Sequence, residues 1–191
     1  MNLRPILALM FLAIAPVKLL AQGQPSQEIA FDYTYLHTNA PPGGCGCFSM
    51  NGGGGSYAYH FGPQLALLAD VEVAHASKAD GYGDDLTLTS FLAGPRFYYR
   101  RPAARWVPYG QALVGGVRST GSLAAANSQG SPTYVAFGAT LGGGVEYNLS
   151  RTFTLRLVEV DYFVTTFPNL VNNRQNNLRV TAGVAYHFGK R

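Results

Sequence analysis

The sequence has few charged residues, only two cysteines and, after residue 22, no run approaching about 18 uninterrupted apolar residues. The missing run excludes a transmembrane helix in that part of the chain, because a helix needs about 20 apolar residues to cross a bilayer. A charged fraction of 13% beside a hydrophobic fraction of 47% excludes a disordered polymer. One compact domain is therefore expected.

The two cysteines, Cys45 and Cys47, lie in the segment PPGGCGCFS with one glycine between them. Two cysteines are too few for a disulfide framework, and a structural zinc site would need a second pair of ligands. A strained local disulfide and a free pair in a loop are both compatible with this spacing. No cofactor is predicted.

The N-terminal residues 1–21, MNLRPILALMFLAIAPVKLLA, have the features of a secretory signal peptide. Arg4 precedes an apolar run over residues 6–15, and the small residue Ala21 stands at the predicted cleavage site. The run is too short to span a bilayer as a helix. We expect residues 1–21 to be cleaved and residues 22–191 to form the exported domain; an uncleaved N-terminal anchor is the alternative.

The chain is only weakly basic. Its formal net charge is +4, and loss of Arg4 and Lys18 with the signal peptide would leave +2. The arginines are scattered and form no basic stripe. Nucleic acid is therefore excluded as an expected partner.

Glycine and tyrosine are abundant, with 23 and 12 residues. Glycine costs about 1 kcal/mol relative to alanine in a helix, whereas aromatic residues favour strands. The exported domain divides into eight segments of alternating polarity separated by turn-rich stretches. We predict strands at residues 27–38, 54–62, 65–77, 86–99, 106–119, 133–148, 152–165 and 176–188. This pattern predicts an all-β fold, a closed antiparallel up-and-down transmembrane β-barrel of eight strands.

Alternation is clearest in the last segment. Its predicted lipid-facing residues are Leu178, Val180, Ala182, Val184, Tyr186 and Phe188. The residues between them, Arg179 among them, are predicted to face the lumen. The same alternation turns Asp70 and Glu72 inward in one segment and Glu146 inward in another.

The segment 152–165 follows the same rule with one difficulty. Its alternation turns Glu159 and Asp161 inward but places Arg156 on the lipid side. A long side chain early in a strand can reach the interface, and a bulge could also reset the face. In segment 106–119, Gln111 interrupts either alternation, so we assign that segment no face.

Short and long connections alternate along the chain, as in outer-membrane barrels. The long ones are predicted at residues 39–53, 78–85, 120–132 and 166–175. The glycine run at residues 51–55 is interpreted as part of the first loop, because no lysine follows it as in a phosphate loop. Aromatic residues gather near both ends of the segments in two girdles, in which Tyr109 and Phe163 are included.

The last segment, LRVTAGVAYHFGKR, together with FLAGPRFYYR and RLVEVDYF, resembles strands of the small outer-membrane β-barrel family typified by the transmembrane domain of OmpA. Phe188 resembles the C-terminal aromatic by which such barrels are recognised for insertion, although Gly189, Lys190 and Arg191 follow it here. The resemblance implies the fold, the outer membrane of a Gram-negative-type bacterium, and partnership with membrane lipid and the barrel-insertion machinery. It carries no catalytic signature.

The inward charges form the strongest candidate site. Unpaired charges in a narrow lumen would be expensive, so these groups should pair or keep water. The predicted lumen charge network comprises Asp70, Glu72, Arg96, Arg118, Glu146, Glu159, Asp161 and Arg179, with Arg118 provisional.

No catalytic or metal site is predicted. The four histidines, His37, His60, His75 and His187, lie on different segments, and none forms a metal pair at helical or strand spacing. A hydrolase built on His75 with Asp84 and Asp85, and with Ser77 or Ser90 nearby, would lack the G-x-S-x-G elbow. We treat His75 as a rim residue.

The sequence therefore predicts a non-enzymatic outer-membrane protein with a structural or surface-interaction role. A small passive channel is the first alternative, and a soluble lipocalin-like carrier is the second. The residues identify no surface ligand.

Overall fold

The computed structural model describes residues 26–38, 47–77, 85–121, 133–168 and 173–189. These residues form eight strands: β1 (Gln27–Thr38), β2 (Phe48–His60), β3 (Leu65–Ala76), β4 (Leu86–Tyr98), β5 (Trp106–Thr120), β6 (Thr133–Asn148), β7 (Phe153–Thr165) and β8 (Gln175–Phe188). Within this part of the chain, no helix has the length and apolar character that crossing a membrane requires. The predicted signal peptide and Cys45 lie outside the described residues, and Cys47 is exposed.

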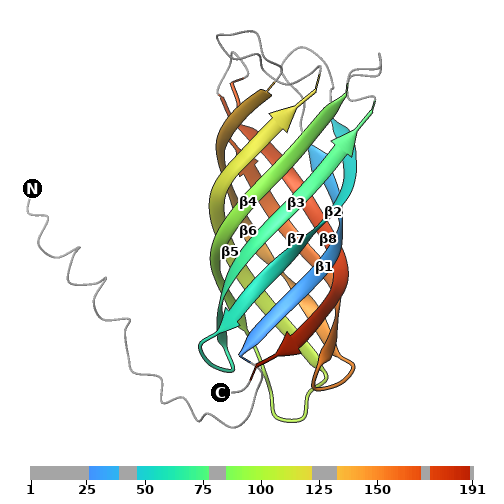
Figure 1. Ribbon diagram of the computed structural model, residues 1–191, viewed down its shortest axis with the longest axis vertical. Helices are drawn as coiled ribbons and strands as arrows, with labels where there is room; N and C mark the ends of the chain where they lie inside the picture. The colour runs from blue at the N-terminus through green and yellow to red at the C-terminus, as the bar shows by residue number, and fades with distance from the viewer. Residues whose placement is uncertain (1–25, 39–46, 78–84, 122–132, 169–172, 190–191) are drawn as a thin grey trace, which may run out of the picture.

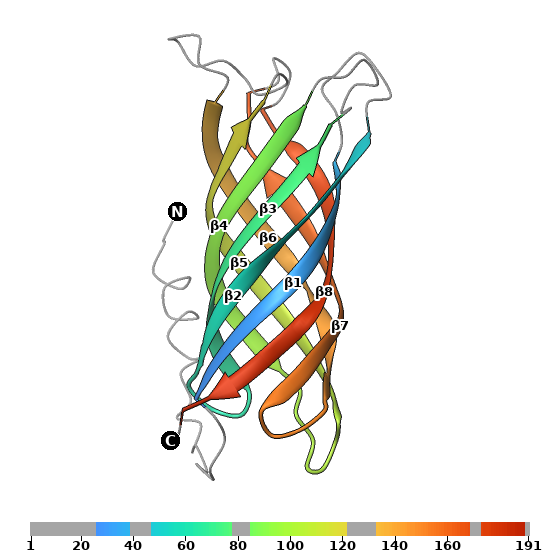
Figure 2. The same cartoon turned by 45° about the vertical axis from the view of Figure 1, so that its right-hand side comes forward.

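Each strand pairs antiparallel with its neighbours in the sequence, and β1 also pairs with β8, so the sheet closes (Figure 1). The predicted eight-stranded barrel is confirmed. At one end, called here the turn end, lie the three short connections together with the start of β1 and the end of β8. The opposite end, called the loop end, carries the other four connections. Figure 2 shows the tilted β1 and β8 side by side, where the first and last strands meet.

Pairing around the barrel is staggered. Leu36 of β1 pairs directly with Met50 of β2. Followed from Leu36 the other way around the barrel, from one paired residue to the next, the pairing returns to β2 at His60; the residues passed are Arg179, Asp161, Gly142, Gln111, Arg96 and Ala66. The register thus advances from Met50 to His60 in one circuit, and this stagger accompanies the tilt of the strands. It brings inward residues of distant segments to the same level.

Strand β2 is longer than predicted, because the glycine run belongs to it. Gly52 to Gly55 pair with β1 and with β3. A Cβ built on Gly54 would lie 2.2 Å from the carbonyl oxygen of Val71, so only glycine permits this close approach of β2 to β3. The interpretation of residues 51–53 as loop was therefore wrong.

The two faces of the wall follow the predicted alternation. Outward residues are large and apolar, among them Phe31, Leu67, Val71, Phe91, Val114, Val135, Leu141, Leu178 and Val184, each at least 43% exposed. Such a face suits lipid contact. Strand β5 turns Gln111 inward with Val107, Tyr109 and Leu113, which settles the face that the sequence left unassigned.

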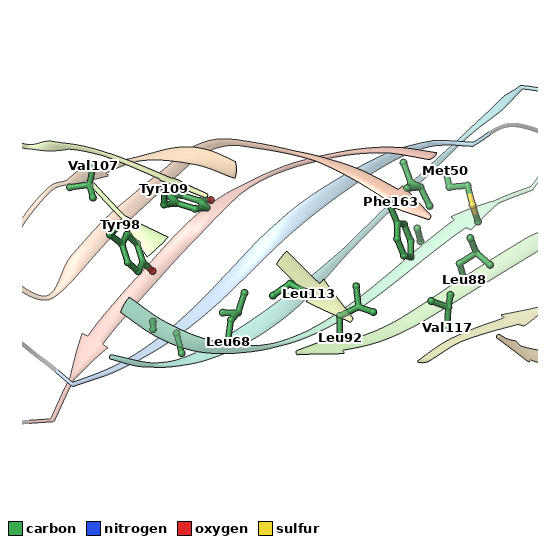
Figure 3. Packing of buried hydrophobic residues seen from close by; sticks show 14 of the residues in the cluster. Met50, Leu68, Leu88, Leu92, Tyr98, Val107, Tyr109, Leu113, Val117 and Phe163 are labelled. Carbon is green, nitrogen blue, oxygen red and sulfur yellow. The ribbon is translucent and has the colours of Figure 1, made fainter. Parts of the chain in front are cut away.

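Apolar side chains fill the lumen towards both ends. Figure 3 shows Met50, Leu88, Leu92, Val117 and Phe163 gathered on one side, with Tyr98, Val107 and Tyr109 apart from them. The first group comes from strand segments next to the loop end, and the second from segments next to the turn end. Tyr109 and Phe163 are buried, so the prediction that they belong to the outer girdles was wrong.

Candidate functional site in the barrel lumen

Charged side chains fill the lumen between the two apolar groups. Among the described residues, seven carboxyl groups and three guanidiniums are buried in the lumen, and none is more than 7% exposed. The acids are Glu28, Asp32, Asp70, Glu72, Glu146, Glu159 and Asp161, and the bases are Arg96, Arg156 and Arg179. A fourth arginine, Arg100, is half-buried at the turn end, with its guanidinium carbon 4.4 Å from the centre of the Tyr98 ring. The acids outnumber the bases because β1, β3, β6 and β7 all contribute carboxylates at inward positions.

At one level of the barrel, a carboxylate and an amide lie on the two sides of a glycine. Asp161 of β7 pairs in register with Gly142 of β6, which pairs with Gln111 of β5. Gln111 Nε2 reaches across the glycine and donates to Asp161 Oδ2 at 3.1 Å. A Cβ on Gly142 would lie 2.3 Å from Asp161 Oδ1, so the glycine leaves the room that this bond needs.

Arg179 joins two strands that are distant in sequence. Its Nη2 lies 2.6 Å from Asp161 Oδ2, and its Nη1 lies 3.0 Å from Asp70 Oδ1 on β3. Its Nε also donates to Asp161. Charge-assisted bonds of this length between buried groups are strong, and they fix the guanidinium plane.

Arg96 approaches the same region from β4. Its Nη2 lies 2.9 Å from Glu159 Oε2, and its Nε donates to Gln111 Oε1 at 2.8 Å. The guanidinium carbon lies 4.4 Å from the centre of the Tyr109 ring, in cation–π geometry. The Tyr109 hydroxyl donates to Glu159 at 2.6 Å. Arg96 is therefore held by three partners and is 1% exposed.

Arg156 is also buried in the lumen. Of the two alternatives that the sequence left open, a lipid-side position and a bulge that resets the face, the structure has the bulge. The register of β7 shifts between Arg156 and Glu159 on β8, and Leu157 and Val158 both face outward. This β-bulge puts Arg156 and Glu159 on the same face although they are three residues apart. Arg156 Nη1 lies 2.8 Å from Asp32 Oδ2, across Gly183, and its Nη2 lies 3.1 Å from Glu28 Oε1.

Two carboxylates are held less tightly. Glu146 is fully buried, and neither of its oxygens has a hydrogen bond among the described residues. Its Oε1 lies 3.6 Å from Arg156 Nη2 and 3.8 Å from Arg96 Nη1. Glu72 accepts a hydrogen bond from the Thr34 hydroxyl. Among the described residues, neither group has a hydrogen bond to one of the three arginines.

The turn end of the lumen contains two histidines beside one carboxylate. His60 Nε2 of β2 lies 3.2 Å from Glu28 Oε2, and His187 Nδ1 of β8 lies 3.6 Å from the same oxygen. The Tyr98 hydroxyl donates to that oxygen at 3.3 Å. Among the described residues, Glu28, His60 and His187 are the group whose ligand atoms lie close enough together to hold a metal ion.

Arg118 was wrongly included in the predicted network. It is exposed on the outward face of β5, because the inward positions of that strand are the odd-numbered ones from Val107 to Ser119. His75 is likewise exposed and bonded to Thr87, whereas Ser90 is buried inside. The two lie on opposite faces of the wall, which does not favour the hydrolase hypothesis.

The other seven predicted residues lie in the lumen, and the structure adds residues that the prediction lacked: Glu28, Asp32, Tyr109, Gln111 and Arg156. Glu28 and Asp32 had a usable signal, because they alternate with the apolar residues Ile29, Phe31 and Tyr33. Glu159, which was predicted, lies at the centre of the network, because its carboxylate is within 4 Å of all three arginines.

A family model for the outer membrane protein beta-barrel domain matches residues 6–189. Among solved structures, neisserial surface protein A is 17% identical over 87% of this chain and 99% of its own, with a TM-score of 0.64. Ail, the attachment invasion locus protein of Yersinia pestis, is 16% identical over 86% of this chain and 99% of its own, with a TM-score of 0.56. A comparison with curated proteins gave no match.

A third similar structure is OprG of Pseudomonas aeruginosa, 12% identical over 89% of this chain and 99% of its own, with a TM-score of 0.53. Identities this low show a common fold. The family match is broader evidence, because it spans the whole barrel and agrees with the closed sheet and its apolar outer face. This chain therefore belongs to the outer-membrane proteins with a beta-barrel domain.

Proposed function

We propose that the protein is a non-enzymatic component of the outer membrane, whose closed barrel holds the four loop-end connections for contact with the cell's surroundings. The filling of the lumen carries this proposal. Arg96, Arg156 and Arg179 link carboxylates across the barrel, and Leu92 and Phe163 are among the apolar residues packed beyond them. A lumen built in this way serves as a rigid support.

Similar barrels support a surface role. One of them is named for attachment and invasion, and it has also been solved with the heparin analogue sucrose octasulfate. A soluble carrier with a ligand inside its barrel fits less well, because apolar side chains cover the outside and charged pairs occupy the inside. We therefore assign interaction with surroundings to the loop end.

Trypsin applied to intact cells tests this assignment. Lys78 and Arg174 belong to loop-end connections, whereas Arg105 and Arg151 belong to turns at the opposite end. Cleavage after Lys78 or Arg174 in intact cells, with cleavage after Arg105 or Arg151 only after permeabilisation, is the expected result. The reverse order, or recovery of the protein in the soluble periplasm, would contradict the proposal.

A small cation leak is the second candidate, favoured by the surplus of lumen carboxylates over guanidiniums. Residues 22–191 in planar bilayers, recorded beside a trimeric porin, are expected to give at most rare small openings, because eight strands enclose side chains rather than a water channel. Substituting Glu159→Gln should alter their frequency. Regular cation-selective steps would favour the channel, and porin-sized steps would reject the closed lumen.

A further inference from the structure

Three side chains from adjacent strands bring ligand atoms together at the turn end of the lumen. Glu28 of β1, His60 of β2 and His187 of β8 each offer one atom, and the three atoms lie within 4.8 Å of one another. Glu28 and His60 are buried, and His187 is 9% exposed. The group is therefore enclosed yet accessible from one side.

A hydrogen-bond chain fixes which nitrogen of His187 faces the carboxylate. The Thr154 hydroxyl donates to Asn148 Oδ1 at 3.0 Å, so towards His187 Nε2, 2.9 Å away, it can only accept. Nε2 therefore carries the hydrogen, and a neutral His187 presents the Nδ1 lone pair to Glu28 Oε2 at 3.6 Å. A lone pair facing a carboxylate oxygen leaves a position between them that a proton or a metal ion can occupy. A hydrogen bond from the other ring nitrogen, as here to Thr154, orients the ligand histidines of metal sites.

Two of the three separations between ligand atoms agree with a tetrahedral metal, and the third, between the two histidine nitrogens, is at most 4.8 Å. Ligand atoms about 2.0 to 2.1 Å from a zinc ion lie about 3.3 Å from one another. The separations of Glu28 Oε2 from His60 Nε2 and His187 Nδ1 are 3.2 and 3.6 Å. Two histidines and one glutamate are a ligand set that zinc uses when it keeps one position open.

The charge of the lumen favours the same ligand. Seven carboxyl groups are buried beside three buried guanidiniums, and Arg100 at the turn end adds a fourth, its guanidinium carbon 4.4 Å from the centre of the Tyr98 ring. Glu146 is fully buried and has no hydrogen bond among the described residues. Arg156 holds the other oxygen of Glu28, Oε1, at 3.1 Å, which leaves Oε2 directed at the histidines. The carboxyl groups still outnumber the guanidiniums, and a metal ion bound at Oε2 would not displace this arginine.

We propose that Glu28, His60 and His187 form a zinc site at the turn end, with the fourth position open to water beside the Tyr98 hydroxyl. The ion would join β8, β1 and β2, the strands on both sides of the place where the barrel closes. Its role would be structural, as a clamp across the closure, and it does not depend on what the loop end contacts.

Zinc titration of untagged protein, refolded in detergent and freed of metal by chelation, tests the site by calorimetry. One saturable site is expected. The substitutions His60→Gln and His187→Gln should each abolish it, and Thr154→Val, which removes the orienting hydroxyl, should weaken it about 10-fold or more. The matched controls His37→Gln and His75→Gln change exposed histidines and should bind zinc like the wild type.

A second measurement needs no variant. Zinc should lower the modification of His187, the more exposed of the two ligand histidines, by diethylpyrocarbonate, detected by mass spectrometry, while His37 and His75 react equally with and without zinc. Absence of stoichiometric binding, binding that survives both ligand substitutions, binding lost on changing Cys45 and Cys47 to serine, or modification of His187 that zinc leaves unchanged would overturn the proposal.

Discussion

Replacing Arg179 by methionine should strand two buried carboxylates. Asp161 and Asp70 lie 2.6 and 3.0 Å from the guanidinium, and all three groups are at most 4% exposed. Removing one partner of a buried ion pair costs about 3 to 5 kcal/mol, mostly because the remaining charge is buried without compensation. Arg179→Met should lower the free energy of unfolding by about that amount. Adding Asp70→Asn and Asp161→Asn should recover most of the loss, because no charge then remains stranded.

Urea unfolding in detergent micelles measures these differences, with the fluorescence of Trp106, the single tryptophan, as the probe. Arg118→Met is the matched control, since Arg118 is exposed on the outer face and its loss should cost about 0.5 kcal/mol or less. A triple variant as unstable as Arg179→Met alone, or an Arg179→Met variant no less stable than Arg118→Met, would show that stranded charge is not the cause.

Two further substitutions test the wall and the glycine spacing. Ala182→Arg places a charge on the outer face near the middle of β8 and should reduce the folded fraction in lipid vesicles, at a cost of about 2 to 4 kcal/mol; Ala182→Leu should fold normally, and equal folding of both would refute the outward assignment. Gly142→Ala would put a Cβ 2.3 Å from Asp161 Oδ1 and should destabilise by about 1 to 3 kcal/mol. Gly116→Ala meets nothing within 4 Å and should be tolerated, so equal unfolding midpoints would contradict the crowding at Gly142.

The sequence was sufficient for the fold and for the facing of most strands. Alternation with period two assigns a residue to a face without knowledge of its partners, so Asp70, Glu146 and Arg179 could be placed inside. The faces of β5 are harder to assign from the sequence, because its inward face mixes Gln111 with Leu113 and so does not differ in polarity from its outward face. Arg118 was misplaced for this reason.

Partners across the lumen could not be predicted in the same way. Arg179 and Asp70 meet because the stagger of the whole barrel brings β8 and β3 to one level, and alternation within a strand contains no such information. The bulge in β7 turns Leu157 and Val158 outward together. The charge of Arg156 indicated a possible bulge, but because both of these residues are apolar, the polarity pattern could not decide between a bulge and a lipid-side arginine. The approach of His60 and His187 to Glu28 could not be predicted either, because it also depends on the stagger of the barrel.

The lumen charges also constrain the order of assembly. Arg156 of β7 bonds to Glu28 and Asp32 of β1, so the partners lie in the first and the seventh strand of the barrel. These bonds form only when the two ends of the sheet meet, and until then the carboxylates of β1 must keep their water. Closure is thus the step that removes water and completes the pairs together, which makes the barrel cooperative. A chain without β8 could not close the sheet between β1 and β8, and the carboxylates of β1 would then lack the ion pairs that allow them to be buried.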